Sequence, residues 1–273
     1  MLKKILLILL LTGLTSAMYG SGWPVKKGSG YFQMSAQYMG SDKYYDSDGD
    51  KVDIPKFSDF TISLFGSYGV TDKISVYGSF PFMRFLTTEN SITGGEATNT
   101  GLSDFTLGMK YYLGKLAGTY FSAKVSVGIP VGDNEDENFL FTGDGEWNQY
   151  FAIAAGRSLG NGFYVGADAG FSNRNEGYSD DILYNAEVGY KVSTNLLVIL
   201  KINGKQPLEN GSNIQFGGVA GLAANNQKYL AYGPELLYSI NDKIGLNAAL
   251  QTGTNTANVI SALVFKGGLY YKL

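Results

Sequence analysis

The sequence predicts an all-β protein, an antiparallel β-barrel of about twelve strands, and three observations carry this prediction. Apolar and polar residues alternate with a period of two along most of the chain. Glycine and tyrosine are abundant, with 37 and 20 of the 273 residues, and this composition favours strands joined by tight turns. Short and long connections follow one another in turn, as they do in a barrel of hairpins.

The alternation is clearest between residues 119 and 130. Phe121, Ala123 and Val125 share one face of this segment, and Ser122 and Lys124 share the other. A strand with one apolar face gives this pattern. Twelve such strands are expected, near residues 31–40, 57–70, 74–84, 102–113, 119–130, 146–157, 163–173, 181–192, 196–205, 228–240, 244–253 and 260–272.

The connections between these strands fall into two classes. Short ones are expected at 71–73, 114–118, 159–162, 193–195 and 241–243, and longer polar ones near 41–56, 86–101, 131–145, 174–180, 206–227 and 254–259. An even strand count places both termini on the short-turn side. The segment 206–227 holds an apolar, glycine-rich run and is either a folded-in loop or an extra strand pair, which would make fourteen strands.

The first seventeen residues read as a signal peptide. Lys3 and Lys4 precede an unbroken apolar run, and Ala17 fits the small-residue position before a cut. The run is shorter than the roughly 20 residues that a membrane-spanning helix needs. Residues 18–273 are expected to form a single barrel domain, because the similar segments that begin at Ser58 and Ser103 suggest repeated hairpins of one sheet.

Three features favour a transmembrane outer-membrane barrel over a secreted soluble β-protein, which is the alternative. The last residues alternate outward up to Leu273, as in outer-membrane barrels. Aromatic residues gather at strand ends as girdles do, at Tyr68, Tyr111, Tyr112, Phe163, Tyr190, Tyr238, Tyr270 and Tyr271. Charged residues occupy polar-face positions within the strands and are candidates to line a wet lumen: Lys110, Lys124, Asp168, Glu187, Lys201 and Glu235.

The composition also excludes several functions. The chain has no cysteine and no histidine, so it has no disulfide framework, no thiolate zinc site and no histidine-based catalytic site. We therefore expect no enzyme. The net charge of −3 has the wrong sign for binding nucleic acid.

Two pairs of stretches resemble a known family. The first runs from Gly22-Trp23-Pro24 to Tyr31 and leads into Asp42–Asp50; the second comprises Gly101–Asp104 and Gly128–Asp133. Together they resemble outer-membrane proteins grouped as the meta-pathway phenol-degradation family. This resemblance implies a barrel that passes hydrophobic or aromatic compounds, and it implies no catalytic residues.

Two cross-strand pairs are expected on the lumen face. The turn at 193–195 places Glu187 opposite Lys201, which predicts an ion pair. Lys110 and Lys124 are expected to be neighbours across the turn that joins their strands. Either Asp168, Asp104 or solvent compensates these two like charges, or the pair forms a cationic patch that favours anions or carboxylates.

Pro234 falls inside an expected strand, where it cannot donate a ladder hydrogen bond. The sequence therefore predicts a bulge or a gap in the ladder there and, as a sharper hypothesis, a lateral opening beside the 206–227 loop.

Two acidic loops are candidates for cation contacts. Asp46, Asp48 and Asp50 surround Gly49 and resemble a calcium loop, although the glycine stands two places early and the alternative is a solvated outer loop. No other cofactor is expected. Residues 133–137 form the second acidic loop, for which divalent-bridged contact with lipopolysaccharide is the alternative to a solvated loop.

The sequence thus predicts a channel or transporter of the bacterial outer membrane. Its partners would be outer-membrane lipid and a small, hydrophobic or aromatic, solute that crosses passively. The alternative function is a non-conducting structural or adhesive surface barrel that acts through its outer loops.

Overall fold

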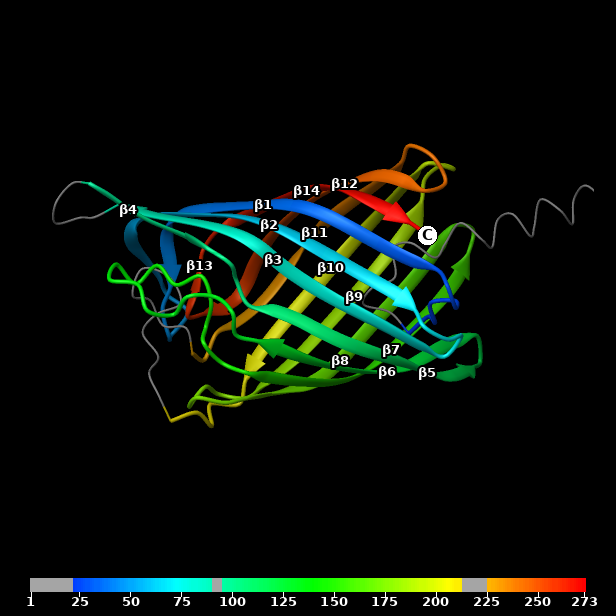
Figure 1. Cartoon of the computed structure of the whole chain (residues 1–273), viewed down its shortest axis with the longest axis horizontal. Helices are drawn as coiled ribbons and strands as arrows, with labels where there is room; N and C mark the ends of the chain where they lie inside the picture. The colour runs from blue at the N-terminus through cyan, green and yellow to red at the C-terminus, as the bar shows by residue number, and fades with distance from the viewer. Residues whose placement is uncertain (1–21, 90–94, 213–224) are drawn as a thin grey trace, which may run out of the picture.

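The computed structural model describes residues 22–89, 95–212 and 225–273, and all of these residues belong to one barrel or to its connections. The strands cross the barrel obliquely, and β4 and β13 lie at the end opposite the C-terminus (Figure 1). The expected signal peptide at 1–17 lies outside the described residues. The strands are β1 (Gly30–Tyr45), β2 (Lys51–Gly69), β3 (Ile74–Glu89), β4 (Glu96–Gly101), β5 (Phe105–Leu116), β6 (Thr119–Ile129), β7 (Asn148–Gly160), β8 (Phe163–Arg174), β9 (Asp181–Lys191), β10 (Leu196–Pro207), β11 (Lys228–Ser239), β12 (Ile244–Ala257), β13 (Val259–Ile260) and β14 (Leu263–Lys272).

Twelve long strands form a closed antiparallel barrel, as the sequence predicted. Each strand pairs with its neighbours in chain order, and β1 pairs with both β2 and β14. The closing seam between β1 and β14 holds ten residue pairs, from Tyr31↔Lys272 to Gly40↔Leu263. The barrel therefore has no free edge in this wall.

The two additional short strands, β4 and β13, do not come from the 206–227 loop, although the sequence allowed an extra strand pair there. β4 continues the line of β5 beyond an interruption at 102–104 and pairs with β3, and β13 continues β14 and pairs with β1. Residues 213–224 of that loop lie outside the described residues.

The expected loops at 41–56 and 86–101 are largely strand instead. β1 and β2 stay paired out to Tyr45↔Lys51, and β3 and β4 pair out to Glu89↔Glu96. Polar residues outnumber apolar ones in these extensions, so the period-two signal fades although the backbone ladder continues. Alternation marks a strand only where one face meets an apolar phase.

The five short turns are stabilised in two ways. The side-chain oxygens of Thr71, Ser193 and Asn241 each accept two backbone N–H hydrogen bonds from residues two and three places later. The two-residue turns at Ala117-Gly118 and Asn161-Gly162 instead have positive φ at both positions, as type I′ hairpin turns require. Side-chain hydrogen bonds thus fix three of the five short connections, and backbone conformation with positive φ fixes the other two.

The distribution of side chains is the inverse of that in a soluble protein. Large apolar residues on the outer face of the wall are exposed, among them Met34, Leu107 and Leu200. Polar residues on the inner face are buried, among them Asp168 and Asn247. Lipid is the surrounding that makes such an apolar outer face favourable.

The expected aromatic girdle is present but smaller than predicted. Its six outward members are all exposed, whereas the alternation turns Tyr112 and Tyr270 inward. Tyr270 is buried, and Tyr112 faces Tyr120 with the ring centroids 6.1 Å apart.

No helix in the described ranges is long and apolar enough to cross a membrane.

Replacing Leu200 by arginine tests this inversion. Leu200 is 57% exposed on the outer face of β10, so in water the change would be nearly neutral. In lipid we expect a loss of about 2–4 kcal/mol in the free energy of folding, measured by urea titration in phospholipid vesicles. Thr194→Arg, in the exposed turn before β10, is the matched control and should change the free energy by less than about 0.5 kcal/mol. Equal effects for the two variants would contradict a lipid-facing wall.

Candidate functional site

The barrel interior holds a cavity of about 960 Å³ in its short-turn half. Its lining comes from nearly every strand and includes Lys110, Lys124, Asp168, Glu187 and Lys201. A second cavity of about 260 Å³ shares Tyr31, Phe65, Lys201 and Asn203 with the first and includes Glu235. The six charged residues singled out from the sequence therefore all line the lumen cavities.

Lys110 and Lys124 are directly opposite each other on β5 and β6, in the expected register. Lys124 Nζ lies 3.3 Å from Asp168 Oδ2. The other oxygen of Asp168 accepts hydrogen bonds from Tyr150 Oη at 2.9 Å and Asn185 Nδ2 at 3.0 Å. Asp168, rather than Asp104 or solvent, is therefore the group that compensates the charge of Lys124. Asp104 lies elsewhere, at the outer loop. The carboxylate holds Lys124 in place and leaves its ammonium on the cavity wall.

Glu187 and Lys201 are also opposite each other, as the turn predicted. However, Lys201 forms its ion pair with Glu235 on the neighbouring strand β11. The predicted Glu187–Lys201 ion pair is not the one that forms, because Lys201 reaches an acid on either neighbouring strand and register alone does not choose between them. Asn247 Nδ2 donates to Glu235 Oε1 at 3.3 Å and adds to this second charged group.

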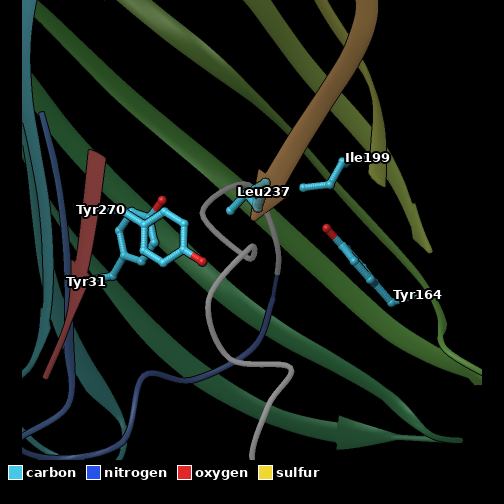
Figure 2. Close-up of a cluster of buried hydrophobic side chains, with 5 residues drawn as sticks. All are labelled: Tyr31, Tyr164, Ile199, Leu237 and Tyr270. Carbon is cyan, nitrogen blue, oxygen red and sulfur yellow. The ribbon is translucent and has the colours of Figure 1, made fainter. Parts of the chain in front are cut away.

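An aromatic and aliphatic cluster occupies the inner wall beside these charges. The rings of Tyr31 and Tyr270 stack with centroids 5.3 Å apart. Figure 2 shows them near the end of Leu237, with Ile199 and Tyr164 on the other side of that residue. Of this cluster, Tyr31 lines both cavities, whereas Tyr164 and Tyr270 are almost fully buried.

The loop between β6 and β7, residues 130–147, folds into the outer mouth of the barrel. Leu140 is fully buried against Phe57 and Leu86 on the inner face of β2 and β3, and Asn99 Nδ2 donates to its carbonyl at 2.8 Å. Asp104 accepts from three backbone N–H groups of the loop, those of Val131, Gly132 and Asp144, at 2.7–3.0 Å. The Asp104 carboxylate thus holds both ends of the loop by hydrogen bonds.

A buried ion network closes the opposite side of the outer mouth. Arg174 contacts Glu146 at 2.5 Å and Asp181 at 3.5 Å, and Lys205 contacts Asp181 at 3.1 Å. Burial raises the pKa of Glu146 to about 7, although the charge of Arg174 acts to lower it.

Pro234 lies within β11 and pairs with Leu200 of β10. On the side of β12, the ladder is interrupted at Gly233 and Pro234, and the register is the same before and after the interruption. A lateral opening at this point stays a prediction.

The acidic side chains of both outer loops support their own turns. Asp46 Oδ1 accepts from the backbone N–H of Asp48 and of Asp50, and Asp136 Oδ1 accepts from that of Asn138 and of Leu140. Within the described ranges, no group of three or more carboxylates is placed to hold a metal ion. Calcium binding by Asp46, Asp48 and Asp50 stays a prediction.

Sequence reasoning missed two segments that enter the lumen, residues 22–28 and the 130–147 loop. Leu140 lies in a short apolar run, Phe139-Leu140-Phe141, within a polar segment, and its burial depends on contacts distant in sequence. A signal was present in Asp104 and in Gly143 of the loop, because a Cβ atom at Gly143 would overlap the carboxylate of Asp104.

Comparison with known proteins assigns the chain to a family. Residues 42–262 match the family described as "Putative MetA-pathway of phenol degradation". The chain belongs to this family. No curated protein matches the sequence significantly.

Solved structures with the same fold are outer-membrane barrels. The COG4313 outer membrane channel from Pseudomonas putida F1 has a TM-score of 0.71 at 16% identity, covering 93% of this chain and 98% of that one. The NanC porin has a TM-score of 0.58 at 7% identity, with 88% and 100% covered. The KdgM porin in complex with disordered oligogalacturonate has a TM-score of 0.54 at 6% identity, with 88% and 98% covered. The protein thus has the fold of an outer-membrane β-barrel.

Asp168→Asn tests the lumen ion pair. Removing the carboxylate leaves Lys124 facing Lys110 without its acid, and we expect a loss of about 1–3 kcal/mol in the free energy of unfolding. The double variant Asp168→Asn, Lys124→Gln should be more stable than Asp168→Asn alone, because both charges are removed together. Urea titration in vesicles measures all three variants. A double variant at or below the stability of Asp168→Asn would show that the two residues do not interact.

Asp104→Ala tests the attachment of the outer loop. Loss of three accepted hydrogen bonds should release residues 131–144, and a glutamate-specific protease should then cut at Glu135 or Glu137 roughly tenfold faster. Asp53→Ala, in the exposed β1–β2 hairpin, is the control. An unchanged cleavage rate in Asp104→Ala would mean that other contacts hold the loop.

Proposed function

We propose that this protein is a passive channel for small aromatic molecules in the outer membrane. The observation that carries the proposal is the cavity of about 960 Å³, lined in part by charged side chains and surrounded by a wall with an apolar outer face. A barrel that only presented loops would gain nothing from charges placed inside it. Burying a charge costs free energy even when the charge is paired, and water or a polar solute in the cavity lowers that cost.

The aromatic part of the proposal rests on the lumen wall and on the family. Tyr31, Phe65 and Tyr77 line the cavity of about 960 Å³ together with the charged residues. Aromatic solutes interact favourably with such rings in stacked and edge-on arrangements. The family description refers to phenol degradation, which supports a solute of this class.

The charges support a preference among such solutes. Lys110 and Lys124 face each other across β5 and β6, with Asp168 as the nearby acid. Lys124 Nζ also lies 5.9 Å from the ring centroids of Tyr77 and Tyr150. A ring that carries a carboxylate or phenolate would satisfy both kinds of contact, so we propose that anionic aromatic solutes pass more readily than cationic ones.

The second candidate function is a surface barrel that acts through its outer hairpins. The extension of β1 and β2 to Tyr45 and Lys51 favours it, since these strands project at the outer end (Figure 1). This role does not require solute passage, so transport measurements separate the two functions.

The test is the entry of 4-hydroxybenzoate into vesicles that contain the refolded protein. We expect entry well above that of protein-free vesicles, because the wall shields the charged solute from lipid. Entry no faster than in protein-free vesicles, with the barrel correctly folded by heat-dependent gel mobility, would contradict the channel function.

Lys124→Glu tests the charge preference. Reversal potentials under a salt gradient should indicate anion preference in the unmodified protein and a loss or reversal of that preference in the variant. Lys56→Glu makes the same charge change at an exposed position of β2 and should leave the preference unchanged. An unaltered potential in Lys124→Glu would remove Lys124 from the selective region.

A further inference from the structure

Residues 22–28, which we call the strap, cross the interior of the barrel before β1 begins. One end lies on β6, β7 and β8, where Trp23 contacts Tyr120 and Tyr164. The other end lies on the β2–β3 turn, where Gly28 N donates to Gly69 O at 2.9 Å and Lys27 N donates to Asp72 Oδ1 at 3.1 Å. On the shorter way around the wall, two strands separate β2 from β6 and four separate β2 from β8, so the strap joins well-separated parts of the wall at the short-turn end.

The wall contains a seat that fits Trp23. Its indole packs edge-on against Tyr164, with ring centroids 5.8 Å apart, and lies 6.1 Å from Tyr120. A Cβ atom at Gly156 on β7 would overlap the indole. Glycine at this position therefore makes room for the ring, and a side chain there is incompatible with the docked strap.

The residue before Trp23 is fixed as closely. Ser122 Oγ donates to Gly22 O at 2.8 Å, and both residues are buried. A Cβ at Gly22 would overlap the carbonyl oxygens of Tyr120 and Ala154. Hydrogen bonding and close backbone approach thus hold this end of the strap against the wall.

The strap also forms part of the lining of the solute cavity. Trp23, Pro24, Val25 and Lys26 line the cavity of about 960 Å³. Ser122, which holds Gly22, stands two residues from Lys124 on the same face of β6. A solute that leaves the charged region toward the short-turn end therefore passes beside the strap.

We infer that Trp23 determines the largest solute that the lumen admits, because it clamps the strap across the short-turn end of the barrel. The inference rests on the proposed channel function. It adds a specificity-determining residue that belongs to neither the charged groups nor the outer loops. Unclamping the strap should widen the path without changing the barrel wall.

Two variants unclamp the strap in different ways. Trp23→Ala removes the ring, and Gly156→Val fills its seat. Gly156→Val is the sharper test because it adds bulk to the inner wall; without a strap it would narrow the lumen, whereas displacement of the strap widens it. The matched controls are Trp147→Ala, at the other tryptophan of the chain, which is 45% exposed, and Gly267→Ala, where the nearest atom to a new Cβ is 3.8 Å away.

The readout is vesicle swelling with a neutral pentose, hexose and disaccharide. In both unclamped variants we expect the disaccharide to enter at a rate near that of the hexose, and in both controls the size limit of the unmodified protein. An unchanged limit in Trp23→Ala, or a narrower limit in Gly156→Val, overturns the inference alone. Failure of every variant and of the unmodified protein to admit the pentose, although all are folded, overturns the proposed function as well.

Fluorescence reports the seat independently of transport. In a Trp147→Phe background, Trp23 is the single tryptophan, and its docked ring should be shielded from acrylamide. Adding Gly156→Val should increase its quenching several-fold. Equal quenching with and without Gly156→Val would show that Trp23 does not occupy this seat, and would also overturn the inference.

Discussion

Closure of the backbone hydrogen-bond ladder is the constraint on which this structure depends. Lipid offers no partner for an exposed N–H or C=O, so a membrane-spanning sheet has to pair its first strand with its last. The ten residue pairs between β1 and β14 do this. These pairs also determine which residues of each strand face the lumen, because residues that pair across two strands lie on the same face of the sheet. Once Met34 faces outward, Gln33 and Ser35 face inward, and the same rule runs round the barrel.

The alternation of inward and outward side chains determines what lines the interior. Twelve strands enclose more space than their inward side chains fill, and the structure uses the remaining space in three ways. Ion pairs such as Lys124–Asp168 keep charge on the wall beside a cavity. The 130–147 loop folds into the outer mouth under the control of Asp104. The strap crosses the short-turn end, held by Trp23 and Ser122. The ion pairs, the outer loop and the strap are thus three separate elements of the lumen. Side chains on the lumen face of the strands hold each of them in place.

The sequence predicted what depends on local periodicity. Strand positions, the short turns and the pairings Lys110↔Lys124 and Glu187↔Lys201 follow from alternation and turn chemistry. It failed where one face no longer meets lipid, as in the outer parts of β1 to β4, because alternation then carries no signal. It also failed where partners are far apart in sequence. Lys201 forms its ion pair with Glu235 and not with Glu187. Leu140 and Trp23 pack against strands that are distant in sequence, and no local pattern indicates these contacts.

The most direct measurement is single-channel conductance of the refolded mature protein in a planar lipid bilayer. A lumen that holds water between its two folded-in segments should give reproducible conductance steps. A barrel that folds and inserts but gives no steps would contradict the account, because the charged cavity would then be closed to ions and solutes.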